Sequence, residues 1–189
     1  MTSTPYFFGY GSLVNRRTHN YPDAHHATLR GWRRAWVPSM RHDRVFLSVT
    51  TDAKTDIKGL IAAVPGADWT ALDARETGYR RQSSGAAVDH PLALDTPVAH
   101  YAVHHSDTGI VQHPHILLSY LDVVVQGFLH EFGEQGVTDF FLTTSGWEIP
   151  VRDDRTKPVY PRHQMLTQKE TALVDWHLDQ LSARVEKGH

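Results

Sequence analysis

The hydrophobic pattern of this 189-residue chain changes near residue 116. Before that point, short segments rich in β-branched and aromatic residues alternate with turns that contain glycine or proline, which is typical of β-strands. After it, apolar residues recur at helical spacing over long stretches. Strands followed by helices favour an α+β fold.

Five strands and three helices are expected from these patterns. The expected strands are Tyr6–Phe8, Ala27–Val37, Val45–Thr51, Asp56–Val64 and the weakly alternating segment Pro97–His104. The first helix begins at Asp68, an N-cap residue, and stops at Gly78. A second helix carries an apolar stripe from Ile116 to Phe132 and ends at Gly133 and Gly136, and a third opens with the capping box Thr167–Glu170.

Composition and charge exclude several classes of protein. The net charge is −2 and the pI is about 6.7, which argues against an electrostatic nucleic-acid binder. The absence of cysteine excludes disulfides, thiolate nucleophiles and cysteine-ligated zinc. The first residues lack the pattern of a signal peptide, and no apolar run is long enough to span a membrane. We therefore expect one domain over residues 1–189, a cytoplasmic location, and neither a nucleic-acid nor a membrane partner.

The first candidate site is the turn Gly9-Tyr10-Gly11-Ser12-Leu13, which follows an aromatic strand. Glycines let the backbone turn sharply and leave its amides unobstructed, so a helical turn starting at Ser12 would make an anion site. A dinucleotide fingerprint is disfavoured, because Val14 stands at the third glycine position and no βαβ unit follows. The alternative is a plain turn that ends a strand.

The second candidate is Glu76, which shares one helical face with Trp69, Leu72 and Asp73. That face points inward, and the last turn of a helix disfavours negative charge. Burial and the helix dipole would both raise the pKa of Glu76, as suits a general acid/base near neutral pH. The alternative is a structural ion pair with one of the neighbouring arginines, Arg75, Arg80 or Arg81.

Together the two candidates resemble the γ-glutamylcyclotransferase family. The resemblance rests on Tyr10-Gly11-Ser12-Leu13 at the end of the first strand and on Leu72-Asp73-Ala74-Arg75-Glu76 with Tyr79, and Ser119-Tyr120-Leu121-Asp122 resembles a helix start of some branches, including bacterial ones. It covers about residues 5–130 and implies a small, closed, mostly antiparallel β-barrel with flanking helices. Residues 131–189 would form a helical C-terminal wrap.

The resemblance also implies a reaction and a set of site residues. A γ-glutamyl amide or peptide would cyclise to 5-oxoproline through attack by its own α-amine, so that no protein nucleophile, cofactor or metal is needed. Glu76 would be the catalytic acid/base. The substrate would be held by Tyr10, Gly11, Ser12, Leu13, Tyr79 and Tyr120. Two alternatives stay open, namely a binding module without catalysis on the same fold and an amidohydrolase of related amides.

Some features depart from the family pattern or lie outside it. Asn15 stands where glutathione-acting members often have tryptophan, and only Thr77-Gly78 follows the glutamate where those members have a longer glycine-containing segment. The proline-stiffened segment Gly146–Arg162 could cover the pocket mouth and contact the leaving amine, or simply wrap the core with a solvated charge cluster. The 14 histidines include the pairs His25-His26 and His104-His105 and the run His113-Pro114-His115, which suggest surface enrichment more than a metal site.

Overall fold

The computed structural model describes residues 3–42 and 44–187. The elements of the main sheet are β1 (Tyr6–Gly9), β2 (His25–Ser39), β3 (Arg44–Ala63), β4 (Arg80–Ser83), β5 (Val88–Asp89), β6 (Val98–Ala102) and β8 (Thr144–Ser145). A small second sheet contains β7 (Ile116–Leu117), β9 (Val151–Asp153) and β10 (Val185–Lys187). The α-helices are α1 (Thr70–Arg75), α2 (Leu118–Leu142) and α3 (Gln168–Gln180). The predicted α+β class is confirmed.

The main sheet is curled but does not close into a barrel. Its strands follow the order β4-β6-β1-β3-β2-β5, with β8 added to β2, and most of the pairings are antiparallel. The terminal strands of that order, β4 and β5, are not paired with each other in the described parts of the chain. The expected closed barrel is therefore corrected to an open one, since the order runs from β4 to the two-residue strand β5 and no pairing between these two is found in the described residues.

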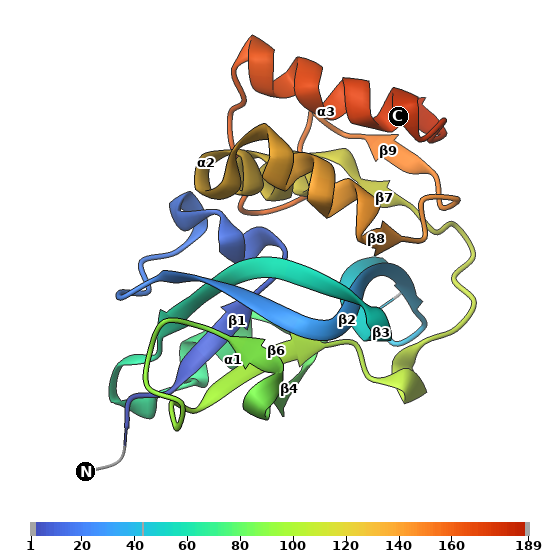
Figure 1. Cartoon of the computed structure of the whole chain (residues 1–189). Helices are drawn as coiled ribbons and strands as arrows, with labels where there is room; N and C mark the ends of the chain where they lie inside the picture. The colour runs from blue at the N-terminus through green and yellow to red at the C-terminus, as the bar shows by residue number, and fades with distance from the viewer. Residues whose placement is uncertain (1–2, 43, 188–189) are drawn as a thin grey trace.

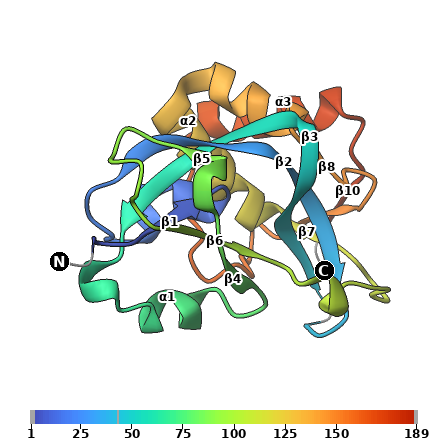
Figure 2. The same ribbon diagram turned by 60° about the horizontal axis from the view of Figure 1, so that its bottom comes forward.

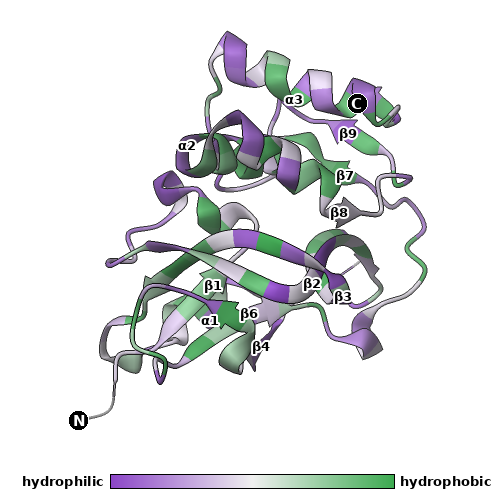
Figure 3. Ribbon diagram, in the orientation of Figure 1, coloured by the Kyte–Doolittle hydropathy of each residue, from purple (hydrophilic) through white to green (hydrophobic). Residues whose placement is uncertain are grey.

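Helices cover both sides of the sheet. Figures 1 and 2 show α2 and α3 on one side and the short helix α1 on the other. Successive side chains of β1 point to opposite faces of the sheet, which explains why helices pack on both faces. Phe8 belongs to the large core under α2, while Phe7 belongs to a smaller core with Leu72 of α1. Figure 3 shows hydrophobic residues along much of α2, and buried side chains of this helix and of the sheet form the large core. The end of β1 therefore reaches the boundary between the two cores.

Two expected strands are parts of one long strand. The segments Val45–Thr51 and Asp56–Val64 join into β3, which pairs with β2 over most of its length. The register shifts at this point, because Arg30 pairs with Asp56 and Trp32 with Thr51, so that the polar residues 52–55 bulge out of β3 opposite Gly31, whose φ is +73°. The Gly31 amide donates to Asp56 Oδ1 at 2.9 Å, which holds this bulge in place.

The second helix also differs from the expectation. Ile116 and Leu117 form the short strand β7, so α2 begins at Leu118. Gly133, with φ +68°, interrupts the helical geometry, but the chain resumes it and continues to Leu142. The helix does not end here because Val137, Phe140 and Phe141 beyond the glycine are buried in the large core. No helix in residues 3–42 and 44–187 is long and apolar enough to cross a membrane.

Helix α3 begins as the sequence predicts, whereas α1 begins one residue later than expected, with Trp69 instead of Asp68 at the N-cap position. Asp68 Oδ1 accepts from the Thr70 amide at 2.9 Å at the start of α1. Thr167 and Glu170 form the reciprocal capping box of α3. Helix α1 is short, so Glu76 lies just past its end, and Asp73 is exposed rather than part of the inward face.

Candidate functional site

The loop after β1 is buried and rigidly held. Ser12–Val14 form one 3-10 turn, in which the Val14 amide donates to the Gly11 carbonyl at 3.0 Å. The Tyr10 hydroxyl donates to the Tyr101 carbonyl at 2.5 Å. Asn15, the departure from the family pattern, is 2% exposed and donates from Nδ2 to the Val123 carbonyl at 3.0 Å. Its amide side chain therefore ties the loop to α2.

Arg34 supports this loop from behind. It is 1% exposed on β2, and its Nε donates to the Tyr10 carbonyl at 2.8 Å. Its guanidinium also lies over the rings of Phe128 and Phe140 of α2, 4.8 and 5.2 Å from their centroids. Burial lowers the pKa of Arg34 to about 9, so that it still carries its charge at neutral pH. A fixed cation therefore holds the strand end against α2.

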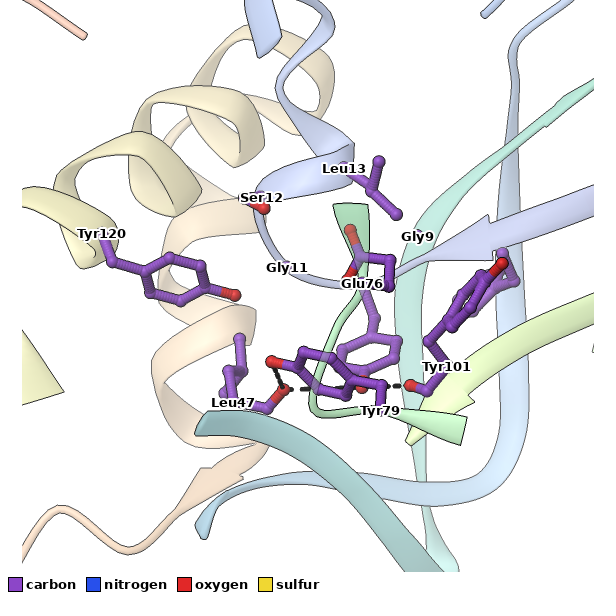
Figure 4. A pocket seen from close by; sticks show the side chains of 11 residues that line it. Gly9, Gly11, Ser12, Leu13, Leu47, Glu76, Tyr79, Tyr101 and Tyr120 are labelled. Atoms are coloured by element: carbon purple, nitrogen blue, oxygen red, sulfur yellow. Dashed lines mark hydrogen bonds between the residues drawn. The ribbon is translucent and has the colours of Figure 1, made fainter. Parts of the chain in front are cut away.

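Glu76 lies where α1 ends and faces the loop. Its backbone amide closes the helix on the Leu72 carbonyl at 2.9 Å, and its side chain is only 14% exposed. Figure 4 shows the carboxylate pointing toward the Gly11–Leu13 backbone. Burial raises the pKa of Glu76 above its usual value, although the charges of Arg75 and Arg162 act in the opposite direction. Burial is thus the physical reason for the raised pKa.

Arg75 is the ion-pair partner that the alternative reading of Glu76 required. Its Nε lies 3.1 Å from Glu76 Oε1, and its side chain is 8% exposed. The same guanidinium donates to the Thr18 carbonyl at 2.8 Å and reaches Ser12 Oγ at 3.4 Å. Arg75 therefore joins the end of α1 to the loop after β1, and both the ion pair and the inward-facing carboxylate are present.

A narrow cavity of about 20 Å³ lies between Glu76 and the loop and opens toward solvent. All the residues that the sequence predicts for the site line it, namely Tyr10, Gly11, Ser12, Leu13, Glu76, Tyr79 and Tyr120. The structure adds Phe8, Gly9, Leu47 and Tyr101. We call this space the inner cavity. The structure thus brings together motifs that are about sixty residues apart in the sequence.

The tyrosines of the inner cavity are hydrogen-bond donors, not bases. The Tyr79 hydroxyl donates to the Leu47 carbonyl at 3.0 Å, and the Tyr120 hydroxyl points into the cavity from α2. Burial raises the pKa of Tyr10, Tyr79 and Tyr120 well above the usual value. At neutral pH these hydroxyls keep their protons. Among the described residues that line the inner cavity, Glu76 is therefore the only one whose side chain, when ionised, can act as a base.

Sequence reasoning missed three contributors to this site. The Leu47 carbonyl receives the Tyr79 hydroxyl, but a backbone group leaves no signal in the sequence. Nothing in the sequence indicates the role of Arg34 either, since the sequence does not distinguish a buried arginine on a strand from an exposed one. Tyr101 was expected only as part of a strand, and its hydroxyl donates to Asp73 Oδ1 at 2.5 Å.

The segment Gly146–Arg162 has two different parts. Asp154 and Arg155 are structural, since Asp154 accepts from the Ser119 amide at 2.8 Å and Arg155 pairs with Asp122 at 2.7 Å. Tyr160 and Arg162, in contrast, line a second cavity that opens from the inner one past Glu76. We call it the outer cavity.

The histidine-rich spots do not gather into a cluster. Within the described part of the chain, no group of three or more His, Asp or Glu side chains is arranged to hold a metal ion. His104 and His105 do not point to opposite faces, as neighbouring strand residues would, because β6 ends at Ala102. Their rings instead lie 4.1 Å apart between centroids.

Gly11→Ala should impair binding and turnover together. The added Cβ would lie 2.7 Å from the Tyr120 hydroxyl oxygen and 3.2 Å from Leu47 Cδ2, so that either the loop or Tyr120 must move. A displacement of this kind costs about two orders of magnitude in catalysis when reacting groups lose their alignment. Steady-state kinetics would measure KM and kcat, with a thermal melt to verify folding. Unchanged constants in a folded variant would show that this close contact has no catalytic role.

Comparisons with known proteins agree with the fold, and the range matched by a family model contains both motifs. Residues 5–85 match the family model of ChaC-like proteins. A solved γ-glutamyl cyclotransferase superposes with a TM-score of 0.56 at 10% sequence identity, covering 92% of this chain and 99% of that protein. The human protein loc79017 gives 0.55 at 11% identity, with the same coverage.

YkqA from Bacillus subtilis gives a TM-score of 0.55 at 18% identity over 77% of this chain, which spans 57% of the length of YkqA. At these identities, the structural similarities show a shared fold. A comparison with curated protein sequences finds no match.

Proposed function

We propose that this chain acts as a γ-glutamylcyclotransferase and cyclises a γ-glutamyl amide or peptide to 5-oxoproline with release of the amine, which the match of residues 5–85 to the ChaC-like family model and the shared fold support. One observation carries the proposal. The buried carboxylate of Glu76 faces the backbone of the Tyr10–Leu13 loop across the inner cavity. A proton acceptor and a row of backbone amides are the two components that this reaction needs from the protein.

The reaction needs no nucleophile from the protein. The α-amine of the substrate attacks its own γ-carbonyl carbon, a new C–N bond closes the five-membered ring, and the original C–N bond to the amine breaks. Glu76 takes the proton that the attacking nitrogen loses and returns it to the leaving nitrogen. No water or oxidant is consumed. The principal task of the protein is then to fold the glutamyl group so that amine and carbonyl meet.

The loop and the tyrosines have the other roles in this proposal. Backbone amides of the Tyr10–Leu13 loop would hold the α-carboxylate and the oxyanion that forms on the γ-carbonyl. Tyr79 and Tyr120 would contact the bound substrate as hydroxyl donors, since burial keeps both protonated. Arg75 would position Glu76 and Ser12 relative to each other through its contacts with both.

Release of 5-oxoproline from a small panel of γ-glutamyl amides tests this function. We expect 5-oxoproline and free amine in equal amounts. Release of glutamate instead would identify an amidohydrolase. Binding of γ-glutamyl compounds without any turnover would identify a binding module on the same fold.

Activity is expected to survive treatment with a chelator followed by dialysis. Cyclisation as proposed uses only proton transfer and hydrogen-bond donors, all of which this chain supplies. The measurement is the rate of 5-oxoproline release before and after treatment. A loss that zinc or manganese restores would point to a metal held by the histidine-rich spots.

A further inference from the structure

The outer cavity has room for the amine part of a substrate. It shares Ser12, Leu47, Glu76, Tyr79 and Tyr120 with the inner cavity, so the two spaces meet at the carboxylate. Its volume is about 330 Å³. If the glutamyl group occupies the inner cavity, the leaving amine extends into the outer one.

One wall of the outer cavity comes from a loop that is firmly attached to α2. Asp154 is 3% exposed and accepts from both the amide and the hydroxyl of Ser119, at 2.8 and 2.6 Å. The same carboxylate accepts from the Val159 amide at 2.8 Å, and the Tyr160 amide donates to Ser119 Oγ at 3.2 Å. The Tyr160 ring then packs edge-on against Tyr120, with 5.0 Å between centroids. This loop therefore holds Tyr160 and Arg162 in fixed positions.

Arg162 places on this wall a guanidinium that has no ion-pair partner among the described residues. Its side chain is half-buried and lines the outer cavity. No side chain in residues 3–42 and 44–187 forms a hydrogen bond or an ion pair with its guanidinium, whereas Arg75 in the same cavity is committed to Glu76 and Thr18. The charge of Arg162 also lowers the pKa of Glu76, against the larger effect of burial, which indicates that it acts close to the carboxylate.

The surroundings of Arg162 favour an anionic ligand. Arginines are the cations of this cavity, and Glu76, which the proposed reaction uses, is its only carboxylate among the described residues. Trp36, Phe46 and Tyr160 supply an apolar and aromatic wall beside these charges. A guanidinium suits a carboxylate because it can donate two parallel hydrogen bonds.

We propose that Arg162 binds a carboxylate on the amine part of the substrate, so that this chain selects γ-glutamyl amino acids or peptides over γ-glutamyl alkylamines and diamines. The inference rests on the proposed function. It assigns a specificity role to a residue of the C-terminal segment, outside the residues 5–85 that match the family model.

Two substrates that differ only in this carboxylate test the proposal, namely γ-glutamylglycine and γ-glutamylmethylamide. We expect kcat/KM of the wild-type protein to favour γ-glutamylglycine by about ten- to a hundredfold, the usual worth of a charge-assisted contact. Arg162→Gln should remove most of this preference, because kcat/KM for γ-glutamylglycine falls much more than kcat/KM for the methylamide. Arg162→Lys should keep part of it, because the charge remains.

Arg44→Gln is the matched control. Arg44 lines the same cavity but is exposed, so solvent screens its charge and we expect a smaller change in the ratio. Because the Arg162 guanidinium has no partner among the described residues, its variants should fold, which a thermal melt verifies. Equal ratios in the wild-type protein and Arg162→Gln would overturn the proposal.

The outcome is distinguishable from a failure of the proposed function. If both compounds are turned over with no preference between them, the reaction holds and only the role of Arg162 is refuted. If neither yields 5-oxoproline, the reaction itself is refuted, and calorimetric binding of both compounds to the wild-type protein and to Arg162→Gln still tests the carboxylate contact. Stronger binding of γ-glutamylglycine that disappears in the variant would support the contact, and equal binding would contradict it.

A pH profile separates this role from a merely structural one. Removing the Arg162 charge should raise the pKa of Glu76 further, because that charge lowers it in the wild-type protein. A base works only above its pKa, so the acid limb of kcat/KM should move to higher pH in Arg162→Gln. A structural defect would lower the whole profile without moving the limb, and that result would count against the proposal.

Discussion

Glu76→Gln is expected to lower turnover by about two to four orders of magnitude, the usual worth of general acid–base catalysis. Glutamine keeps the shape and hydrogen-bonding capacity of the side chain but cannot take a proton from the α-ammonium group of the substrate. Glu76 is the only ionisable proton acceptor among the described residues that line the inner cavity, so no neighbour can replace it. Steady-state release of 5-oxoproline measures the effect.

The fold of this variant should be intact. Replacing Glu76 removes the cost of burying a carboxylate, and Arg75 loses one partner but keeps its bonds to Thr18. We expect these effects to offset each other to within about 1 kcal/mol of unfolding free energy. Asp68→Asn is the matched control, because Asp68 is exposed on the same part of the chain and asparagine also caps helices. Unchanged turnover in folded Glu76→Gln would remove Glu76 from the mechanism.

The raised pKa of Glu76 predicts how kcat/KM and the stability of the fold depend on pH. As a base, Glu76 is active when ionised, so kcat/KM should fall as the pH drops through a pKa that lies above the usual 4.5. Stability should respond in the opposite sense. The folded state binds this proton more tightly than the unfolded state does, so the contribution of Glu76 to stability is lost as the pH rises through the folded pKa. Both dependences should disappear in Glu76→Gln.

Blocking the α-amine of the substrate is expected to abolish turnover altogether. An N-acetylated γ-glutamyl amide keeps its α-carboxylate, which the amides of the Tyr10–Leu13 loop would still bind, but it lacks the basic nitrogen that closes the ring. It should therefore bind as a competitive inhibitor and not react. Inhibition kinetics together with product analysis measure both properties.

An α-linked glutamyl dipeptide should fail for a different reason. Its α-carboxylate is part of the peptide bond, so the loop amides lose their charged ligand. The loss of one charge-assisted contact costs about 1.5–3 kcal/mol, or roughly a ten- to hundredfold drop in affinity. Turnover of the N-acetyl compound to N-acetylglutamate would contradict cyclisation and identify a hydrolase that uses water.

The main residues of the candidate site could be predicted from the sequence because its two motifs lie at the ends of a strand and of a helix. The strand β1 ends at Gly9, and the loop after it must turn where the glycines allow. Glu76 follows a helix whose inward position, Leu72, is apparent from the helical spacing. The strand order that places one beside the other was beyond sequence reasoning, since β1 contacts partners from β3 and β6 that lie more than 50 residues away.

Other features depend on tertiary contacts that leave no local signal. The long strand β3 looked like two strands because its polar middle resembles a turn, whereas residues 52–55 form a bulge opposite Gly31 and the pairing with β2 continues on both sides of it. Helix α2 continues past Gly133 because the core holds the residues beyond it. The position of Arg162 follows from the buried contact of Asp154 with Ser119, 35 residues earlier in the chain.

Product analysis in water labelled with heavy oxygen tests the central claim most directly. The wild-type protein and Glu76→Gln would each be incubated with a γ-glutamyl peptide, and the products identified by mass spectrometry. The proposed mechanism predicts that the wild-type protein forms unlabelled 5-oxoproline, because no water enters the product, and that the variant forms it at least about a hundredfold more slowly. Glutamate carrying heavy oxygen in its γ-carboxylate, or equal rates for the two proteins, would contradict it.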